Sequence, residues 1–374
     1  MPSEHAALLK DSVTDFVARG TTIARVRALR GSDQEYDRAL WGQMAELGWL
    51  GVAIPEQYGG MGLGLAEAAI VAEGLARALA PEPYTAAAIL AAGALAGCDN
   101  ETLKRELLPS IVDGTRVPAL AWQEAAGVLD TDRIVARATP FEGGFRLNGT
   151  KRYVAGAAGA DVYLVAARSD EGLVLACIDR RAHGAKLELE RLADGRNFGT
   201  LALDDAVVPR ERVAARGEVA ERALAQALDH ATAIASAELY GVMSRALEMS
   251  VDYMKTRVQF GRAIGSFQAL QHRAVDLYIQ QQLASAVLED SLRELDRGPQ
   301  PRERAGIASR LKARCSEAGV RLTREAIQIH GAIGFTDEYD AGLYLKRALV
   351  LSAWLGNATQ HRKRFAALAL NDGS

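Results

Sequence analysis

The 374-residue sequence has few cysteines, few histidines and no long apolar run. Its three cysteines, Cys98, Cys177 and Cys315, have neither metal-ligand spacing nor the pattern of a disulfide framework, so we expect buried thiols in a reducing cytoplasm. No segment approaches the ~20 consecutive apolar residues that span a bilayer, and the polar first residues do not resemble a signal peptide. A net charge of -3 gives no electrostatic reason for a nucleic-acid or anionic-membrane partner.

The familiar catalytic motifs are missing as well. The sequence has no serine-centred nucleophile elbow, no His-Glu-x-x-His, no Walker loop and no Gly-x-Gly-x-x-Gly that opens a helix after a strand. Its six histidines are dispersed, and no metal site is expected. His272 and His330 fall in helical segments, where a hydrogen-bonded structural role is the expectation.

What the sequence does contain is a change of hydrophobic period along the chain. Residues 1–115 repeat apolar side chains at intervals of three and four, which predicts amphipathic helices. Residues 116–213 are typical of β-structure, and residues 214–374 return to the helical period, with helices expected over 220–257, 268–297, 304–330 and 339–370. This order predicts an α+β protein in three domains with these bounds.

Two hairpins are expected in the middle segment. The pair Asn148-Gly149 predicts a tight turn that divides residues 145–154 into two strands. The stretch from Ser169 to Gly172 predicts a second turn, between strands at 162–167 and 173–178.

Residues 257–268 place an arginine at the end of a long helix, beside a tight turn at Phe260-Gly261. A guanidinium group next to exposed backbone donors suits a pyrophosphate, whereas a charged helix end with a glycine cap is the structural alternative. The wider pattern resembles the flavin-binding signature of the acyl-CoA dehydrogenase family. It reads Lys255-Thr256-Arg257…Phe260-Gly261…Ile264…Phe267-Gln268…Gln271.

Three other segments resemble motifs of the same family, in the family's order, at residues 47–62, 148–161 and 328–336. The resemblance spans nearly the whole chain. It implies an N-terminal helical domain, a middle β-barrel or sandwich and a C-terminal four-helix bundle, assembled as a homo- or hetero-oligomer, either a dimer or an α2β2 tetramer. It also implies FAD bound between subunits, an acyl-CoA substrate and electron-transfer flavoprotein as electron acceptor.

The resemblance also implies the residues that contact the cofactor. Arg257, Phe260 and Gln268 would face the adenosine-pyrophosphate half of a neighbour's FAD, with Gln328 and Gly331 close by. In the β domain, Trp122 would flank the flavin or the acyl chain. The family's hydroxyl near flavin N5 follows a Trp-Ile pair, whereas here Tyr153-Val154 is followed by Ala155.

The catalytic base of the family is missing from both of its usual positions. The reaction removes the proton α to the thioester and passes a hydride from the β carbon to flavin N5, so it needs a positioned carboxylate. The resemblance places that glutamate at Leu355 or, in other members, at Ala231. Asp229 and His230 are weak alternative bases, expected on a solvated helix surface, and Glu238 lies about two turns further on.

These departures favour the subunit of a heteromeric acyl-CoA dehydrogenase that lacks the glutamate. The chain resembles the small subunit of α2β2 enzymes that oxidise dicarboxylyl-, steroid- or other unusual acyl-CoA esters. A homomeric dehydrogenase with a non-standard base is one alternative. A flavin monooxygenase or oxidase on the same scaffold is another, and a purely structural subunit without flavin is the last.

Overall fold

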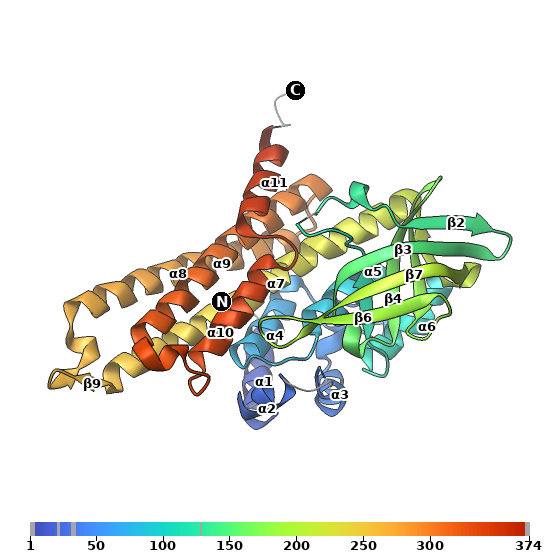
Figure 1. Cartoon of the computed structure of the whole chain (residues 1–374). Helices are drawn as coiled ribbons and strands as arrows, with labels where there is room; N and C mark the ends of the chain where they lie inside the picture. Colours follow the sequence, from blue (N-terminus) through green and yellow to red (C-terminus); the bar gives the residue numbers. More distant parts are fainter. Residues whose placement is uncertain (1–3, 21–22, 31–34, 128, 371–374) are drawn as a thin grey trace. The chain divides into compact units, whose positions relative to one another are not determined.

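The computed structural model describes residues 4–20, 23–30, 35–127 and 129–370 (Figure 1). The helices are α1 (Glu4–Gly20), α2 (Ile23–Leu29), α3 (Arg38–Glu46), α4 (Leu65–Arg77), α5 (Ala92–Ala96), α6 (Glu101–Val112), α7 (Gly217–Thr256), α8 (Gln268–Asp296), α9 (Pro301–His330), α10 (Ala341–Ala353) and α11 (Ala358–Leu370). The strands are β1 (Pro118–Ala121), β2 (Arg137–Phe141), β3 (Gly144–Ala155), β4 (Val162–Ser169), β5 (Gly172–Asp179), β6 (Ala185–Arg191), β7 (Asn197–Pro209), β8 (Val213–Arg216), β9 (Val258–Gln259) and β10 (Arg262–Ala263). The predicted order of helices, strands and helices is therefore confirmed.

The chain forms two compact units, each of which is described by itself. The bundle unit contains Met1–Arg27, Ala69–Ala80 and Thr232–Ser374, and the sheet unit contains Ala28–Ala68 and Pro81–Ala231. The limits of these units differ from the expected boundaries at 115/116 and 213/214. Those boundaries divide the sequence by type of secondary structure, and as domain limits they stay a prediction.

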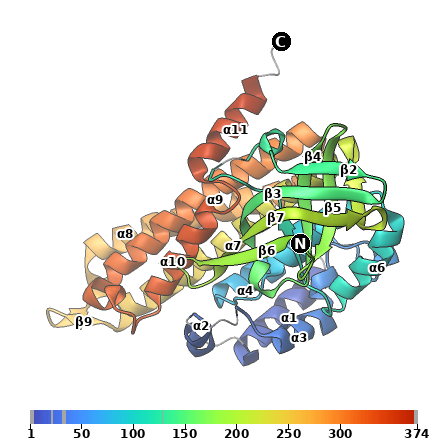
Figure 2. The same cartoon turned by 45° about the vertical axis from the view of Figure 1, so that its right-hand side comes forward.

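The sheet unit is built on one sheet with strand order β6-β7-β3-β2-β4-β5-β8, to which β1 adds by pairing with β4 in parallel. Figure 2 shows β6, β7 and β3 lying side by side. Alternate side chains of these strands point into a common core, which buries Leu147, Tyr163, Val165 and Leu201 almost completely. The candidate cofactor residues of this unit lie at the ends of two strands: Trp122 follows β1, and Val154 and Ala155 end β3.

One of the two expected hairpins is wrong. β3 runs without a break from Gly144 to Ala155, and its register on β7 shifts at Asn148, which faces two residues of β7, Asp204 and Asp205, in a β-bulge of that strand. The Asn148 side chain donates to an Asp205 carboxylate oxygen (2.8 Å) and accepts from the Asp205 backbone N–H (2.9 Å). Gly149 has φ +140°, a conformation that residues with a side chain rarely adopt. The second hairpin is confirmed, since Ser169 pairs with Gly172 across the β4–β5 turn.

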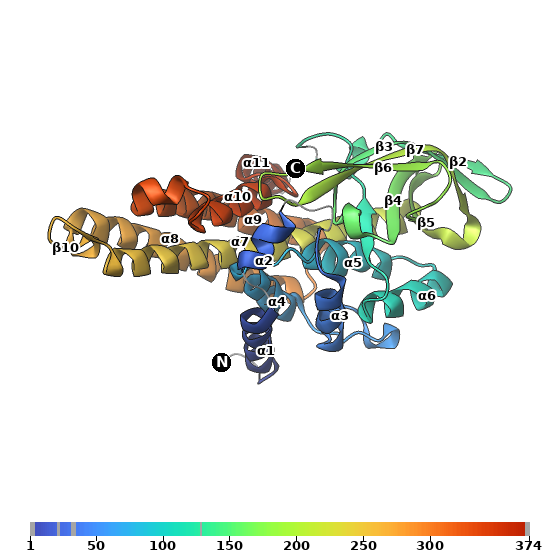
Figure 3. The same cartoon turned by 60° about the horizontal axis from the view of Figure 1, so that its bottom comes forward.

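In the bundle unit, α9 is the central helix and packs against α8, α10 and α11 (Figure 3). It begins at Pro301, where the fixed φ of proline favours the first turn, and buries an apolar face along its length. The helix expected over 339–370 is interrupted, which corrects that prediction. Leu355 (φ +58°) and Gly356 (φ +97°) are left-handed, so the chain cannot continue α10 into α11.

The cysteines and His330, which the sequence analysis singled out, have structural roles. All three cysteines are buried free thiols, as expected, and burial raises the pKa of each to about 12. His330 is also structural. Its Nδ1 bonds the Ala326 carbonyl (2.6 Å), and its ring lies between those of Tyr253 and Tyr339, at 4.6 and 4.5 Å.

Candidate functional site

The end of the bundle unit carries the arginine and the aromatic turn that the sequence singled out. After α7, β9 and β10 form a two-stranded hairpin around Phe260 (φ +54°) and Gly261 (φ +80°). Positive φ at both central residues is the geometry of a tight hairpin turn. The Phe260 side chain is 92% exposed, so the hairpin presents an aromatic ring to the outside of this chain.

Packing brings the two predicted cofactor segments of the bundle to the same end. The ring of His330, the last residue of α9, contacts that of Tyr253 in the last turn of α7. An ion pair between Arg273 and Glu325 (3.4 Å) joins the start of α8 to the end of α9. Gln328 and Gly331 therefore lie at the same end of the bundle as the β9–β10 hairpin, and both are exposed.

Arg257 and Gln268 lie at the two ends of the hairpin segment, and both are exposed. Among the residues that the structure describes, no carboxylate forms an ion pair with the Arg257 guanidinium. The neighbouring Arg262 is different, because its guanidinium lies 4.2 Å from the centre of the Phe267 ring. Phe260 also contacts Phe267 edge-on, with centroids 6.1 Å apart. The hairpin thus offers a cation and an exposed ring on a fixed backbone.

The predicted base position lies in the turn between α10 and α11. Leu355 is 4% exposed and has no group that can accept a proton. His361, which is 1% exposed, bonds the Leu355 carbonyl through Nε2 (2.7 Å) and Ser309 Oγ through Nδ1 (3.2 Å). The fully buried Lys312 ammonium donates to the carbonyl of Leu351, which lies about one helical turn before Leu355.

Within the bundle unit, the acidic side chain closest in sequence to Ala231, the alternative base position, already forms an ion pair. Glu238 of α7 and Arg347 of α10 form a buried ion pair at 2.6 Å. Both side chains are about one-tenth exposed, so the pair is sheltered from water. The charge of Glu238 raises the pKa of Lys312 and that of Arg347 lowers it, but burial is the main reason that this pKa falls to about 7.

We expect the stability of the bundle unit to rise with pH because of Lys312. A lysine in the unfolded chain titrates near 10.4, whereas the folded pKa is about 7. Between these values the unfolded chain binds more protons, so the free energy of unfolding increases with pH by at most about 1.4 kcal/mol per pH unit. Urea unfolding at pH 7.0 and 8.5 should show a smaller increase for Lys312→Met than for the parent. Equal increases would show that Lys312 is not the titrating group.

In the sheet unit, the buried side chain of Lys151 anchors the predicted cofactor loop after β1. Trp122 is 5% exposed, and its carbonyl accepts a bond from the buried Lys151 ammonium (3.3 Å). Lys151 also bonds Glu124, which in turn accepts the backbone N–H groups of Val135 and Ala136 (2.8 and 2.9 Å). Burial lowers the pKa of Lys151 to about 8, against the effect of its carboxylate partner. The loop is held, and its tryptophan is mostly covered.

The end of β3 holds the other two predicted residues. The Val154 side chain is 1% exposed and belongs to the core of the sheet unit, whereas Ala155 is partly exposed. Val154 can therefore meet a ligand through its backbone rather than its side chain. Tyr153, just before it, has φ +57°, a left-handed conformation that is uncommon for a bulky residue.

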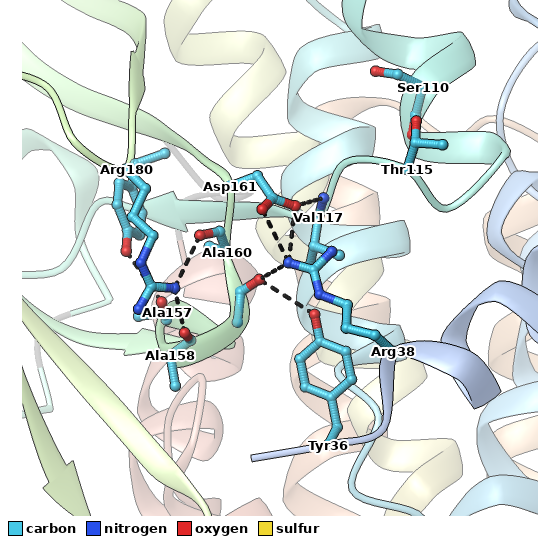
Figure 4. Close-up of polar contacts among 12 residues, drawn as sticks. Tyr36, Arg38, Ser110, Thr115, Val117, Ala157, Ala158, Ala160, Asp161 and Arg180 are labelled. Carbon is cyan, nitrogen blue, oxygen red and sulfur yellow. Dashed lines mark hydrogen bonds and ion pairs between the residues drawn. The ribbon is translucent and has the colours of Figure 1, made fainter. Parts of the chain in front are cut away.

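The segment that follows β3 is clamped by side chains from distant parts of the sequence (Figure 4). The Gly159 carbonyl accepts bonds from Tyr36 (3.2 Å) and Arg38 (2.7 Å), and Arg180 bonds the carbonyls of Ala158 and Ala160. Asp161 accepts from Arg38 (3.0 Å) and from the Val117 N–H (2.8 Å). These bonds fix the backbone next to Ala155 and join it to the start of β1.

The remaining candidates lie on α7. Ala231 is fully buried, and His230 is partly buried. Asp229 is only 1% exposed, which corrects the expectation of a solvated helix surface at this position. The helical period explains the error, because the alanine-rich sequence around Asp229 gives little contrast between its faces.

Sequence reasoning missed the buried basic groups Lys312, Arg347 and His361. A signal was present for the first, since Lys312 shares its helix face with Ala308, Leu311 and Cys315, all buried. A charge on an apolar face of this kind marks a buried polar contact.

Neither a metal-binding cluster nor a membrane-spanning helix occurs among the described residues. Within the described ranges, no group of three or more His, Cys, Asp or Glu side chains could hold a metal ion. No helix in that part of the chain is both long enough and apolar enough to cross a membrane.

Comparison with known proteins identifies the family. The acyl-CoA dehydrogenase N-terminal domain matches residues 3–115, and the acyl-CoA dehydrogenase C-terminal domain matches residues 220–370. Acyl-CoA dehydrogenase IpdE2 of Mycobacterium tuberculosis is 33% identical over 93% of this chain and 92% of its own length. A variant of the Tcur3481–Tcur3483 steroid ACAD is similar in structure, with 32% identity, a TM-score of 0.89 and coverage of 99% and 98%.

The ChsE4–ChsE5 complex of Mycobacterium tuberculosis contains a further similar chain, with 28% identity, a TM-score of 0.91 and coverage of 100% of this chain and 99% of that one. The sequence motifs, the helix–sheet–helix order and these matches over nearly the whole length agree with one another. The chain belongs to the acyl-CoA dehydrogenase family of oxidoreductases.

Proposed function

We propose that this chain is the subunit of a heteromeric, FAD-dependent acyl-CoA dehydrogenase that lacks the catalytic glutamate, with a partner subunit supplying the base for α,β-desaturation of an acyl-CoA thioester. The observation that carries the proposal is Leu355. It occupies the position where the family's glutamate is expected, it is buried, and it cannot accept a proton. The second usual position, Ala231, is equally inert.

The ion pair of Glu238 with Arg347 supports a heteromeric enzyme over a homomeric enzyme with a non-standard base. A general base must reach the substrate proton with a free carboxylate oxygen. Glu238 instead forms a charge-assisted bond with Arg347 inside the bundle, and breaking a buried ion pair of this kind is costly.

The residues at the end of the bundle fit the adenosine-pyrophosphate half of FAD. Arg257 would bind the pyrophosphate, Phe260 would pack against an apolar part of the cofactor, and Gln268 would donate or accept a hydrogen bond. Gln328 and Gly331 lie at the same end. When bound, FAD supplies the acceptor for the hydride, and electron-transfer flavoprotein is the proposed acceptor of its electrons.

An uncharged face on α8 supports assembly with another subunit. The helix carries no charged residue from Leu277 to Leu288. Within and beside this stretch, the exposed apolar side chains Val275, Tyr278, Ile279 and Leu283 recur at intervals of three and four. Depletion of charge together with an exposed aromatic residue is typical of the centre of a protein–protein interface.

The relatives support a steroid-derived acyl chain and a second subunit. One similar structure is the Tcur3481–Tcur3483 steroid ACAD, and another is the ChsE4–ChsE5 complex. We extend both features to this chain as part of the proposal.

The proposed function is tested by the visible spectrum of the purified chain, before and after anaerobic addition of an acyl-CoA panel that includes steroid side-chain esters. We expect a chain that is colourless, or yellow and not bleached by any ester. Co-purification with a second acyl-CoA dehydrogenase subunit should then restore bleaching. A yellow chain that one ester bleaches without any partner would contradict the proposal.

Replacing Arg257 with alanine is expected to weaken FAD binding by about 10–100-fold, because one charge-assisted contact with a phosphate is lost. Flavin fluorescence during titration of the apoprotein complex measures the change. Arg293→Ala serves as a matched control, since Arg293 is an exposed arginine elsewhere in the same bundle. Equal affinity of the Arg257 and Arg293 variants would remove Arg257 from the cofactor site.

A further inference from the structure

The turn at residues 354–357 has a backbone conformation that needs external support. Leu355 has φ +58°, a region that residues with a side chain enter only at an energetic cost. The residue is nevertheless buried, and its neighbour Gly356 is also left-handed. Strain of this kind persists only where the surrounding structure fixes it.

His361 provides one such support, from the first turn of α11. Its Nε2 lies 2.7 Å from the Leu355 carbonyl, and because a carbonyl can only accept, Nε2 carries the proton. Its Nδ1 then accepts from the Ser309 hydroxyl at 3.2 Å. Burial lowers the pKa of His361 to about 3, so the ring stays neutral and in this tautomer.

Lys312 provides the second support, from the middle of α9. The last four carbonyls of a helix lack an intrahelical donor, and that of Leu351 belongs to this set because α10 ends at Ala353. The Lys312 ammonium donates to it although the side chain is completely buried. The two side chains thus hold carbonyls on both sides of residues 352–354.

We infer that Lys312 and His361 are positioning residues that hold the backbone of Leu355, the predicted position of the base, in its left-handed conformation. The meaning of this arrangement for catalysis rests on the proposed function. The conformational part stands on the contacts of the turn alone. Neither residue touches the reacting atoms in this proposal, since both act through the backbone of the turn.

The experiment compares alanine with glycine at position 355. Glycine normally destabilises a fold relative to alanine, because its unfolded chain is more flexible. At a left-handed position the order reverses, since only alanine suffers the Cβ clash. We expect Leu355→Gly to melt about 2–4 °C above Leu355→Ala. Alanine melting at or above glycine would overturn the left-handed assignment.

The same pair is then made in backgrounds that remove each support. In Lys312→Met and in His361→Leu, the advantage of glycine should disappear, because the released turn can leave the left-handed region. In His361→Gln, which keeps an N–H donor, the advantage should persist. An advantage that persists unchanged in the first two backgrounds would overturn the positioning role.

Where His361→Leu does not fold, Ser309→Ala is read in the same way. It removes the hydroxyl that bonds Nδ1 and helps to orient the His361 ring, so the advantage of glycine should shrink there as well. These comparisons measure melting temperature and need no activity. A failure of the positioning role is therefore distinguishable from a failure of the proposed function, which shows in flavin reduction.

Discussion

Replacing Leu355 with glutamate is expected to raise the rate of anaerobic flavin reduction by acyl-CoA by about 10²–10⁴-fold. A positioned general base contributes rate enhancement of this size, because it removes a proton that is otherwise only weakly acidic. The backbone at position 355 is left-handed and is held by the contacts to the Leu351 and Leu355 carbonyls, so a new side chain would start from a defined geometry. Stopped-flow absorbance of the flavin measures the rate.

The control for this gain is Leu355→Gln, which has nearly the shape of glutamate but cannot take up the proton. The resemblance implies a hydroxyl near Ala155, so the double variant Ala155→Ser/Leu355→Glu should reduce the flavin faster than Leu355→Glu alone. Equal rates for the glutamate and glutamine variants, with and without Ala155→Ser, would show that position 355 is not the base position.

Replacing Glu238 with leucine is expected to destabilise the bundle unit by about 3–5 kcal/mol. The substitution removes the carboxylate of a buried ion pair, and breaking such a pair by removing one partner is strongly destabilising because the remaining charge is still buried. The double variant Glu238→Leu/Arg347→Met should recover most of the loss, because it removes both charges. Urea unfolding of the parent and the two variants gives the free energies.

A surface ion pair of the same unit offers the matched control. Arg77 and Glu248 lie 2.7 Å apart, but their side chains are 33% and 44% exposed. Glu248→Gln should therefore cost less than about 1 kcal/mol, since water screens the pair. Comparable losses for Glu238→Leu and Glu248→Gln would contradict the role assigned to burial.

Local pattern was sufficient for the elements with a strong period. The long helices α7, α8 and α9 end within one residue of the predicted positions 257, 297 and 330, because apolar spacing and the Gly-Pro break are local signals. The Phe260-Gly261 turn is local for the same reason. Asn148-Gly149 misled, because its turn preference was overridden by pairing along the whole of β3 with β7.

The sequence by itself determined the family, the order of helical and β segments, and which motif residues to examine, since each of these depends on neighbours along the chain. Only the tertiary structure decided that Glu238 is bound to Arg347, that Asp229 is buried, and that Lys312 and His361 support the turn at Leu355. These contacts join residues far apart in the chain, so they depend on helix packing. Packing also sets the burial that makes a charge costly and its partner necessary.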